Sequence, residues 1–478
     1  MSQRESMPSV PVSPPRLLRD ARSAPSRLGV DPGIWNWHRD HHFSAPPHAN
    51  YYEASLTPWP YFSALAGDHS CDVVVVGGGL LGASTALHLA QAGLDVILVE
   101  KDNLGSAASG RNGGQITPGL ARWGAGAMLD SLSPDEAKRL WRFASAEAMD
   151  LIDQIRADNG FRCERKYGHL TAAMHPGHLY ALTQNARARR VLGDRSVAIL
   201  SPEALKNHVS SDIYHGGALD GRGGQLHPLA LLRGIIYGFT KLGGRVHEQT
   251  EVTEVRESPG DTTVVTTSGN IKARNAVILA VHNFSHRFIH GHPTTMPFFT
   301  YVGVTPPLQT KISELLPSDI AIYDTQLQID YYRHVRHNRL LFGGEGTGSC
   351  LSPEDTNAYL LHRIKTVFPQ LTEATLEYSW SGSSDCTLNG ATDCRKSDAA
   401  VPVYMVHGWS GHGVAQTVRI GKAISDDVTG RNTDFAMLTR IDHTTLPLGR
   451  FLAPVAIPLI KGAVSVFNHL HPTEMVSF

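Results

Sequence analysis

Several features that would assign the chain to a class at once are missing from its 478 residues. The formal net charge is only −1, so the charge balance gives no support to nucleic-acid binding. No run of about 18 or more apolar residues occurs, and we therefore predict no membrane-spanning helix. With 41% hydrophobic and 18% charged residues, the composition is that of an ordinary soluble globular protein.

Cysteine is also scarce, and its spacing is uninformative for metal or disulfide chemistry. The cysteines form no CxxC pair, and their odd number leaves one over in any pairing scheme; they are Cys71, Cys163, Cys350, Cys386 and Cys394. This pattern is typical of reduced thiols, so we predict a cytoplasmic protein. The histidine-rich stretches "HRDHHF" and "HRFIHGHP" have no companion cysteines and no recognised ligand spacing, so we predict no metal site.

The first 50 residues differ from the rest of the chain. They are rich in Pro, Ser and Arg and have no apolar periodicity, which predicts a poorly structured arm over residues 1–50. Few acids and scattered arginines leave an organelle transit peptide as an alternative. There is no apolar signal-peptide core, so secretion is not expected.

Residues 72–100 predict a strand, a tight glycine turn, a helix and a second strand. Gly77, Gly79 and Gly82 form a GxGxxG pattern between the first strand and the helix, as in dinucleotide-binding βαβ units. Glu100 ends the second strand, where a carboxylate binds ribose hydroxyls and repels a 2′-phosphate, which argues against NADP. The unit alone does not separate NAD from FAD.

The stretch "GSAASGRNGGQ" at residues 105–115 favours FAD. Small residues and exposed N–H groups let the backbone pass along the ribityl chain and ring of a flavin, beyond the pyrophosphate. Ser106 and Ser109 offer hydroxyls for phosphate, and Asn112 can contact a polar ring edge. The alternative is a flexible surface loop.

The remaining pattern alternates between helices and β-rich stretches. A capping box at "SPDE" starts a helix that ends at Gly160, and "SPEALKNHV" and His227–Leu242 predict two more. Residues 320–345 predict antiparallel strands, and residues 407–430 a glycine-rich turn that enters a helix. After Pro447 we predict a packed or peripheral helix, because Pro454, Pro458 and Lys461 argue against a membrane anchor.

We therefore predict an α/β fold: a Rossmann-type FAD-binding domain with an inserted substrate domain of antiparallel β-sheet plus helices (α+β). The expected domains are the arm (1–50), a discontinuous FAD-binding domain (51–160, 210–290 and 385–440), a substrate domain (161–209 and 291–384) and a C-terminal tail or helix (441–478).

Beyond these patterns, the sequence resembles a known family. "VVVVGGGLLGASTALHLAQAG", "ASGRNGGQ", "GGQLHPLALLRG", "LQIDYYR", "YSWSG" and "GWSGHGVAQT" are similar, in this order, to D-amino-acid-oxidase-type FAD oxidoreductases. The likeness is strongest to the γ-glutamylputrescine oxidoreductase branch and covers roughly residues 50–460. It implies that Val252 contacts adenine through its backbone and that Ser410–Gly413 present N–H groups to the pyrimidine edge of the flavin.

The glycine motif, the small-residue loop and the resemblance together predict a binding site for non-covalent FAD; attachment through Cys386 stays open. The predicted cofactor-binding residues are Gly77, Gly79, Leu80, Leu81, Gly82, Glu100, Lys101, Ser106, Ser109, Gly110, Asn112, Gly113, Gly114, Val252, Gly411, Gly413 and Val414.

Four residues are candidates for the reaction itself. His412 adjoins the flavin motif, Tyr331 and Arg333 share one face of a strand with Arg333 able to bind a carboxylate, and Trp380 can wall the pocket. Each has a structural alternative, such as a solvated strand arginine or a core tryptophan. The chain departs from the family at "TLNGATD", where Gly390 stands in the usual place of an arginine, so substrate or acceptor preference can differ.

Three functions follow from these patterns. The first is oxidation of the C–N bond of a primary amine of the γ-glutamylputrescine or polyamine type, with oxygen or another electron acceptor. The second is oxidation of small amino acids or N-methyl amino acids. The third is a flavin-binding module without turnover.

Overall fold

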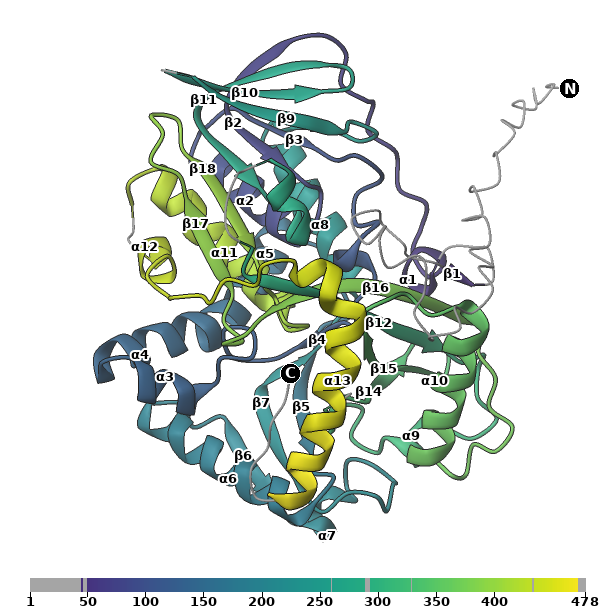
Figure 1. Cartoon of the computed structure of the whole chain (residues 1–478). Helices are drawn as coiled ribbons and strands as arrows, with labels where there is room; N and C mark the ends of the chain where they lie inside the picture. Colours follow the sequence, from purple (N-terminus) through teal and green to yellow (C-terminus); the bar gives the residue numbers. More distant parts are fainter. Residues whose placement is uncertain are drawn as a thin grey trace, which may run out of the picture.

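The computed structural model describes residues 44–45, 50–258, 260–288, 293–327, 329–431 and 434–471. Almost all of the predicted arm, the stretch "HRDHHF" and residues 289–292 of "HRFIHGHP" lie outside this part. Two β-sheets dominate the fold, one in the upper and one in the lower half of Figure 1. Helices cover the upper sheet, and one long helix, α13 (Gly449–Leu470), runs down the front of the molecule.

The upper sheet has eight strands in the order β17-β18-β11-β2-β3-β8, with β10 beside β11 and β9 beside β10. The strands are β2 (His69–Val76), β3 (Val96–Val99), β8 (Arg245–His247), β9 (Val252–Ser258), β10 (Asp261–Thr266), β11 (Gly269–Leu279), β17 (Asp393–Lys396) and β18 (Val403–His407). β2 is parallel to both neighbours, and successive valines of Val73–Val76 enter hydrophobic clusters on opposite faces. Burial on both faces explains the unbroken apolar run, as expected for a central parallel strand.

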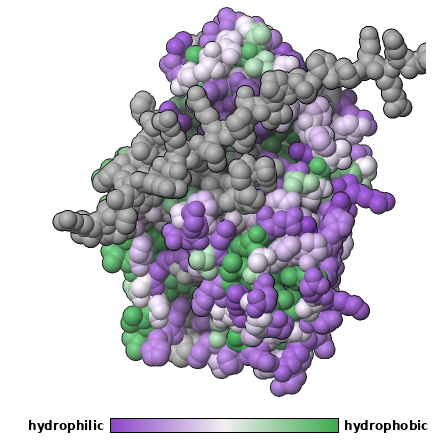
Figure 2. All heavy atoms as spheres, turned by 90° about the vertical axis from the view of Figure 1, so that its right-hand side faces the viewer, coloured by the Kyte–Doolittle hydropathy of each residue, from purple (hydrophilic) through white to green (hydrophobic). Residues whose placement is uncertain are grey.

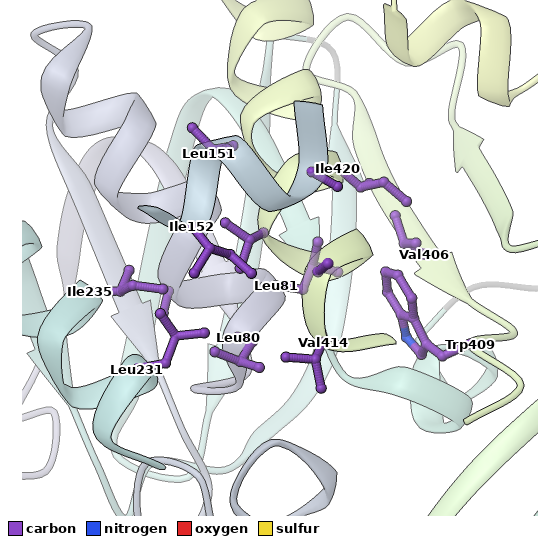
Figure 3. Packing of buried hydrophobic residues seen from close by; sticks show 14 of the residues in the cluster. Leu80, Leu81, Leu151, Ile152, Leu231, Ile235, Val406, Trp409, Val414 and Ile420 are labelled. Atoms are coloured by element: carbon purple, nitrogen blue, oxygen red, sulfur yellow. The ribbon is translucent and has the colours of Figure 1, made fainter. Parts of the chain in front are cut away.

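Three helices pack together on one face of this sheet: α2 (Leu80–Gln91), α8 (Pro228–Lys241) and α11 (Gly413–Val428). α2 and α11 approach closely because Gly421 of α11 lies against Ser84, whose hydroxyl donates to the carbonyl of Val418. Figure 3 shows the result, with Leu80 and Val414, from the first turns of α2 and α11, packed beside each other. Two segments more than 300 residues apart thus start their helices at the same place.

The lower sheet has ten strands, in the order β1-β16-β12-β15-β14-β13-β5-β7-β4 with β6 beside β7. They are β1 (Ser44–Ala45), β4 (Gln115–Ile116), β5 (Lys166–Ala172), β6 (Val197–Leu200), β7 (Gly217–Gln225), β12 (Thr295–Val304), β13 (Ala321–Asp324), β14 (Tyr331–Val335), β15 (Arg339–Thr347) and β16 (Tyr378–Thr387). The antiparallel run β13-β14-β15 confirms the prediction for residues 320–345. Only β13 and β5 pair in parallel in this sheet's described strands.

The helical predictions are confirmed with one refinement. Ser133 and Glu136 form the capping box, and Gly160 ends the run with φ +67°. A π-helical turn, η3 (Phe143–Glu147), interrupts it, which the apolar spacing did not indicate. The other helices are α1 (Tyr51–Ala54), η2 (Ala108–Gly110), α3 (Ala125–Ser131), α4 (Pro134–Arg142), α5 (Ala148–Asn159), α6 (Pro176–Val191), α7 (Pro202–Leu205), η4 (His282–Arg287), α9 (Ile312–Leu315), α10 (Pro353–Val367) and α12 (Asp434–Leu438).

A helix follows Pro447, as predicted, but its apolar character differs from expectation. Phe451–Leu470 is long and apolar enough to cross a membrane, the one such helix in the described residues. Pro454 and Pro458 lie inside α13 and do not end it, and Lys461 forms an ion pair with Glu345. The prediction that the chain has no membrane-spanning segment is therefore not confirmed. It rested on the lack of an uninterrupted apolar run, whereas a helix can have a high mean hydropathy with a few polar residues or prolines in it.

The domain boundaries remain predictions, and three strands of the two expected domains do not follow them. β4 and β7 belong to ranges expected for the FAD-binding domain but pair in the lower sheet, and β16 runs across the boundary at residue 385. The five cysteines are free thiols, as their spacing predicted.

Buried histidines predict acid sensitivity. Burial lowers the pKa of His88 to about 4 and the pKa values of His169 and His227 to about 3, so each is neutral when folded. The unfolded chain takes up these protons below about pH 6.5, so stability is present above that pH and is lost as the pH falls toward 4. We expect the free energy of unfolding to fall between pH 7 and pH 5, by as much as about 1.4 kcal/mol per pH unit for each histidine.

His227→Asn provides a matched variant, since Nδ1 of His227 accepts the N–H of Ala230 at the start of α8 and asparagine is also a good helix cap. Denaturant unfolding at several pH values is expected to give a shallower pH dependence for the variant. Equal slopes for the variant and the wild-type protein contradict the assignment.

Candidate functional site

One large cavity is lined by both halves of the molecule. The upper sheet contributes the ends of β2 and β3, the lower sheet contributes Thr300, Tyr331 and Gly382, and α13 contributes Ile457 and Ile460. The predicted residues that line the cavity are Gly77, Gly79, Leu80, Leu81, Glu100, Lys101, Ser106, Ser109, Asn112, Gly113, Val252, Tyr331, Gly411, His412, Gly413 and Val414. Those that do not are Gly82, Gly110, Gly114, Arg333 and Trp380.

The glycine turn between β2 and α2 needs glycine for two physical reasons. Gly77 has φ +109°, and a side chain there would bring Cβ within 2.5 Å of the carbonyl oxygen of Ala280. A Cβ at Gly82 would collide with the carbonyl oxygen of Gly77, so this glycine permits close packing of helix and turn without reaching the cavity. These are the separate roles expected of the first and third glycines of the motif.

Glu100 lies at the end of β3, beside the glycine turn. Its Oε2 accepts the N–H of Gly78 at 2.7 Å, its Oε1 accepts the N–H of Asp102 at 3.0 Å, and burial raises the pKa of its carboxyl. Val252 follows at the start of β9 and lines the same end of the cavity. This end therefore has the carboxylate and the backbone expected around an adenosine.

The small-residue loop folds over the start of α2. The hydroxyl of Ser109 accepts the N–H of Leu80 at 2.9 Å, and Ser106 also lines the cavity. Oδ1 of Asn112 accepts the N–H of Gly114, and Nδ2 donates to the carbonyls of Ala108 and Ser109. The amide of Asn112 thus holds the loop together, and its expected contact with a ring edge has no support.

Gly110 and Gly114 permit close packing within this loop. A Cβ at either position would collide with a backbone carbonyl, of Gly105 and Leu226 respectively. The two glycines therefore do not line the cavity, but they allow the loop that lines it to fold as it does.

Two long helices begin at the cavity without a side-chain cap from the residue that precedes them. α2 begins after Gly79 and α11 after His412, and neither residue makes a capping hydrogen bond, in contrast to Ser133 before α4 and Ser352 before α10. Unpaired N–H groups and the positive end of the helix dipole make such termini anion sites. A pyrophosphate at one and a flavin pyrimidine edge at the other fit this arrangement, because the cavity joins them.

His412 is enclosed and uncharged. Its Nδ1 lies 3.0 Å from the hydroxyl of Thr117, and burial, with the positive charge of Arg122 and the neighbouring His169, lowers its pKa to about 3. Tyr331 lines the cavity, and burial raises the pKa of its phenol well above 10. Near neutral pH both side chains can form hydrogen bonds but neither changes charge.

Two of the residues predicted for the reaction do not line the cavity. Arg333 is 2% exposed, and its guanidinium donates to the carbonyl of Gly113 at 2.7 Å and to the hydroxyl of Tyr52 at 3.2 Å. Trp380 is fully buried, and its Nε1 donates to the carbonyl of Arg111. Both side chains therefore contact the small-residue loop on the side away from the cavity. The alternation of side chains along a strand predicts which face of the sheet a residue lies on, but not which segment covers that face.

Arg122 is a residue that the sequence did not indicate. Its guanidinium lines the cavity, Nε donates to the carbonyl of Ser410 at 3.2 Å, and Nη1 has no hydrogen-bond partner in the described part of the chain. Burial lowers its pKa to about 10. Its backbone N–H donates to the carbonyl of Gly390, and a Cβ at Gly390 would lie 3.1 Å from that of Arg122. Gly390, where the resemblance predicted an arginine, is therefore packed against an arginine from another segment.

Cys386 also lines the cavity. Burial raises the pKa of its thiol to about 12, so it is protonated and a poor nucleophile near neutral pH. Within the described ranges, no group of three or more His, Cys, Asp or Glu side chains is arranged to hold a metal ion.

Known proteins match this chain over most of its length. Residues 72–426 match the family described as "DAO: FAD dependent oxidoreductase". Gamma-glutamylputrescine oxidoreductase of Escherichia coli K12 is 32% identical over 410 residues, 84% of this chain and 94% of that protein. The probable oxidoreductase OrdL of Haemophilus influenzae is 30% identical over 85% of this chain and 94% of its own length.

Among solved structures, glycine oxidase from Geobacillus kaustophilus superposes with a TM-score of 0.65 at 22% identity, covering 78% of this chain and all of that one. This likeness concerns the fold, and it agrees with the Rossmann-type unit and the second sheet described above. The family match spans the glycine turn at its start and α11 at its end. The chain belongs to the DAO family of FAD-dependent oxidoreductases, and its cofactor is FAD.

Proposed function

We propose that the protein oxidises the C–N bond of a primary amine of the γ-glutamylated polyamine type. The observation that carries the proposal is the apolar part of the cavity lining beyond the cofactor-binding residues. Phe298, Ile329 and Tyr331 belong to it, together with Ile457 and Ile460 of α13. This apolar section fits a chain of methylene groups, which a small amino acid would leave unfilled.

An ion pair stands where this section reaches α13. Lys461 contacts the carboxylate of Glu345 and donates to the carbonyl of Gly346 at 2.8 Å, and all three residues line the cavity. Glu345 has φ +63°, a conformation that costs a residue other than glycine free energy and is commonest at functional sites. One ammonium and one carboxylate side by side complement the zwitterionic end of a γ-glutamyl group. The 32% identity with gamma-glutamylputrescine oxidoreductase supports the same substrate class.

The chemistry requires a neutral amine. When bound, FAD accepts the hydride from the carbon next to nitrogen, and water hydrolyses the resulting imine to an aldehyde and ammonia. An alkyl ammonium with a pKa of about 10.4 in water loses its proton more readily in a buried site, especially one that already holds the Arg122 cation. His412 does not add charge there because its pKa is far below neutral. The residues of the chain thus position and desolvate the amine, and no strong side-chain base is required.

Arg122 favours a second candidate, oxidation of small amino acids or N-methyl amino acids. Its guanidinium, with Nη1 unpaired among the described residues, lies beside His412 and Ser410, so a carboxylate bound there would hold a short substrate near the pyrimidine end of the flavin site. The 23% identity with glycine oxidase of Geobacillus kaustophilus agrees with this alternative.

An anaerobic absorbance titration of the holoenzyme tests the proposal. The panel consists of a γ-glutamylated polyamine, the parent polyamine, short amino acids and N-methyl amino acids. We expect only the γ-glutamylated amine to bleach the flavin rapidly. Bleaching by short amino acids alone establishes the second candidate, and bleaching by none of the compounds contradicts both.

A further inference from the structure

The exposed face of α13 is mostly apolar between Phe451 and Leu470. Between Phe451 and Leu470 the sequence holds no Asp, Glu or Arg and a single lysine, Lys461, which points inward to Glu345. The exposed side chains are those of Leu452, Val455, Pro458, Leu459, Ala463, Ser465, Val466, His469 and Leu470, and Leu459 is 68% exposed. Only Ser465 and His469 among them carry a hydrogen-bonding group. Figure 2 is turned so that the front of Figure 1, where α13 lies, is at its left-hand edge. Hydrophobic surface is visible along that edge.

The two ordinary explanations of an apolar helix do not apply to α13. A core helix of a soluble protein is mostly buried, whereas only 6% of this apolar stretch is buried. A signal sequence lies near the N-terminus, whereas α13 follows the whole catalytic fold. Exposed apolar stripes of this length mark interaction sites.

The inner face ties the helix to the body of the protein. Ala453 is fully buried and packs against Gly348, where any side chain would collide with the helix backbone. Ile457, Ile460 and Lys461 form part of the cavity wall, and α13 packs against β12 and β15. A helix that left the body to cross a bilayer would lose these contacts, so an orientation along a surface is favoured.

We propose that α13 lies in the interfacial plane of a phospholipid bilayer and places the part of the cavity wall that it forms beside the membrane surface. A helix of 22 residues, about 33 Å long, would put its apolar side chains at the boundary of headgroups and acyl chains. Lipid fits better than a protein partner, because protein interfaces carry roughly one hydrogen bond per 100–200 Å² and this face offers almost no partners. The proposal does not depend on which amine is oxidised.

Vesicle co-sedimentation of the full-length holoenzyme tests the proposal. With vesicles of mixed phosphatidylcholine and phosphatidylglycerol we expect the wild-type protein in the pellet. The double variant Val455→Glu, Leu459→Glu is expected to bind about tenfold or more weakly, since it buries two charges in the apolar boundary. Leu242→Glu is the matched control, because Leu242 is 52% exposed at the end of α8, and it is expected to sediment like the wild type. Retained flavin absorbance reports that each variant is folded.

A second variant does not depend on loss of binding. Leu459→Trp adds a reporter to the outer face beside the seven native tryptophans. We expect the added emission, taken as the difference from the wild-type protein, to shift to the blue with vesicles and to be quenched by brominated lipid. Wild-type protein that stays in the supernatant, or unquenched emission, overturns the proposal. Resistance to release by alkaline carbonate means a spanning helix and also overturns it. So does a dimer in the absence of lipid that Leu459→Glu dissociates, since a second copy would then cover the face.

Discussion

Gly77→Val is expected to give a colourless protein that binds FAD about 1000-fold more weakly than the wild type or worse. Gly77 has φ +109°, which valine scarcely adopts, and a Cβ there would approach the carbonyl oxygen of Ala280 to 2.5 Å. Either the turn or β11 must shift, and the start of α2 shifts with it. Fluorescence titration of the apoprotein with FAD measures the loss.

Gly93→Ala is the control for Gly77→Val. It tests whether FAD binding is lost because of the clash at position 77 or whenever a glycine with positive φ is replaced. Gly93 also has a positive φ, +86°, but it follows α2 at its far end, and a Cβ there would have no described atom within 4 Å. Its replacement is expected to cost about 1 kcal/mol of stability and leave FAD affinity unchanged. Equal loss of FAD in both variants, or a yellow Gly77→Val protein, contradicts the role assigned to the turn.

Lys461→Met is expected to raise the KM for a γ-glutamylated polyamine about 30-fold, the equivalent of ~2 kcal/mol for a hydrogen bond to a charged group. The substitution removes the ammonium beside Glu345 at the α13 end of the cavity. The KM for the parent polyamine, which has no glutamyl group, is expected to change little. Lys461→Arg keeps the charge and is expected to restore most of the affinity.

Arg122→Met is the complementary variant, at another residue of the cavity lining. Under the proposed function it leaves the KM for the γ-glutamylated amine within a few-fold of the wild type. If short amino acids are the substrates, it raises their KM about 100-fold, because Arg122 lines the cavity and its Nη1 has no partner within the described ranges. If Arg122→Met raises the KM for short amino acids and Lys461→Met changes no KM, the oxidation of small amino acids replaces amine oxidation as the favoured function.

The parts of the site that lie close together in sequence could be predicted from it. The glycine turn, Glu100 and the loop over 105–115 form one continuous segment, and their spacing fixes which atoms meet. The start of α11 could be added only through the resemblance, because spacing alone cannot place residue 413 beside residue 80. The structure brings these two helix starts together through the packing of Gly421 on Ser84.

Features that depend on distant contacts were missed or misassigned. Arg333 and Trp380 have residue types suited to a binding site, but the loop over 105–115 covers both. Arg122 lies in no motif, and its place follows from the turn at Gly390 and the carbonyl of Ser410, both far away in sequence. The cavity wall formed by α13 was missed for the same reason, since a C-terminal apolar helix carries no signal for where it docks.

The central claim is that the starts of two helices, α2 and α11, hold opposite ends of one FAD. Equilibrium binding of FAD to the apoprotein, compared with ADP-ribose, riboflavin and NAD, tests this claim most directly. We predict tight binding of FAD and about 100-fold or weaker binding of each half, because a half fills only one end. ADP-ribose as tight as FAD, or tight NAD with no uptake of FAD, would contradict it.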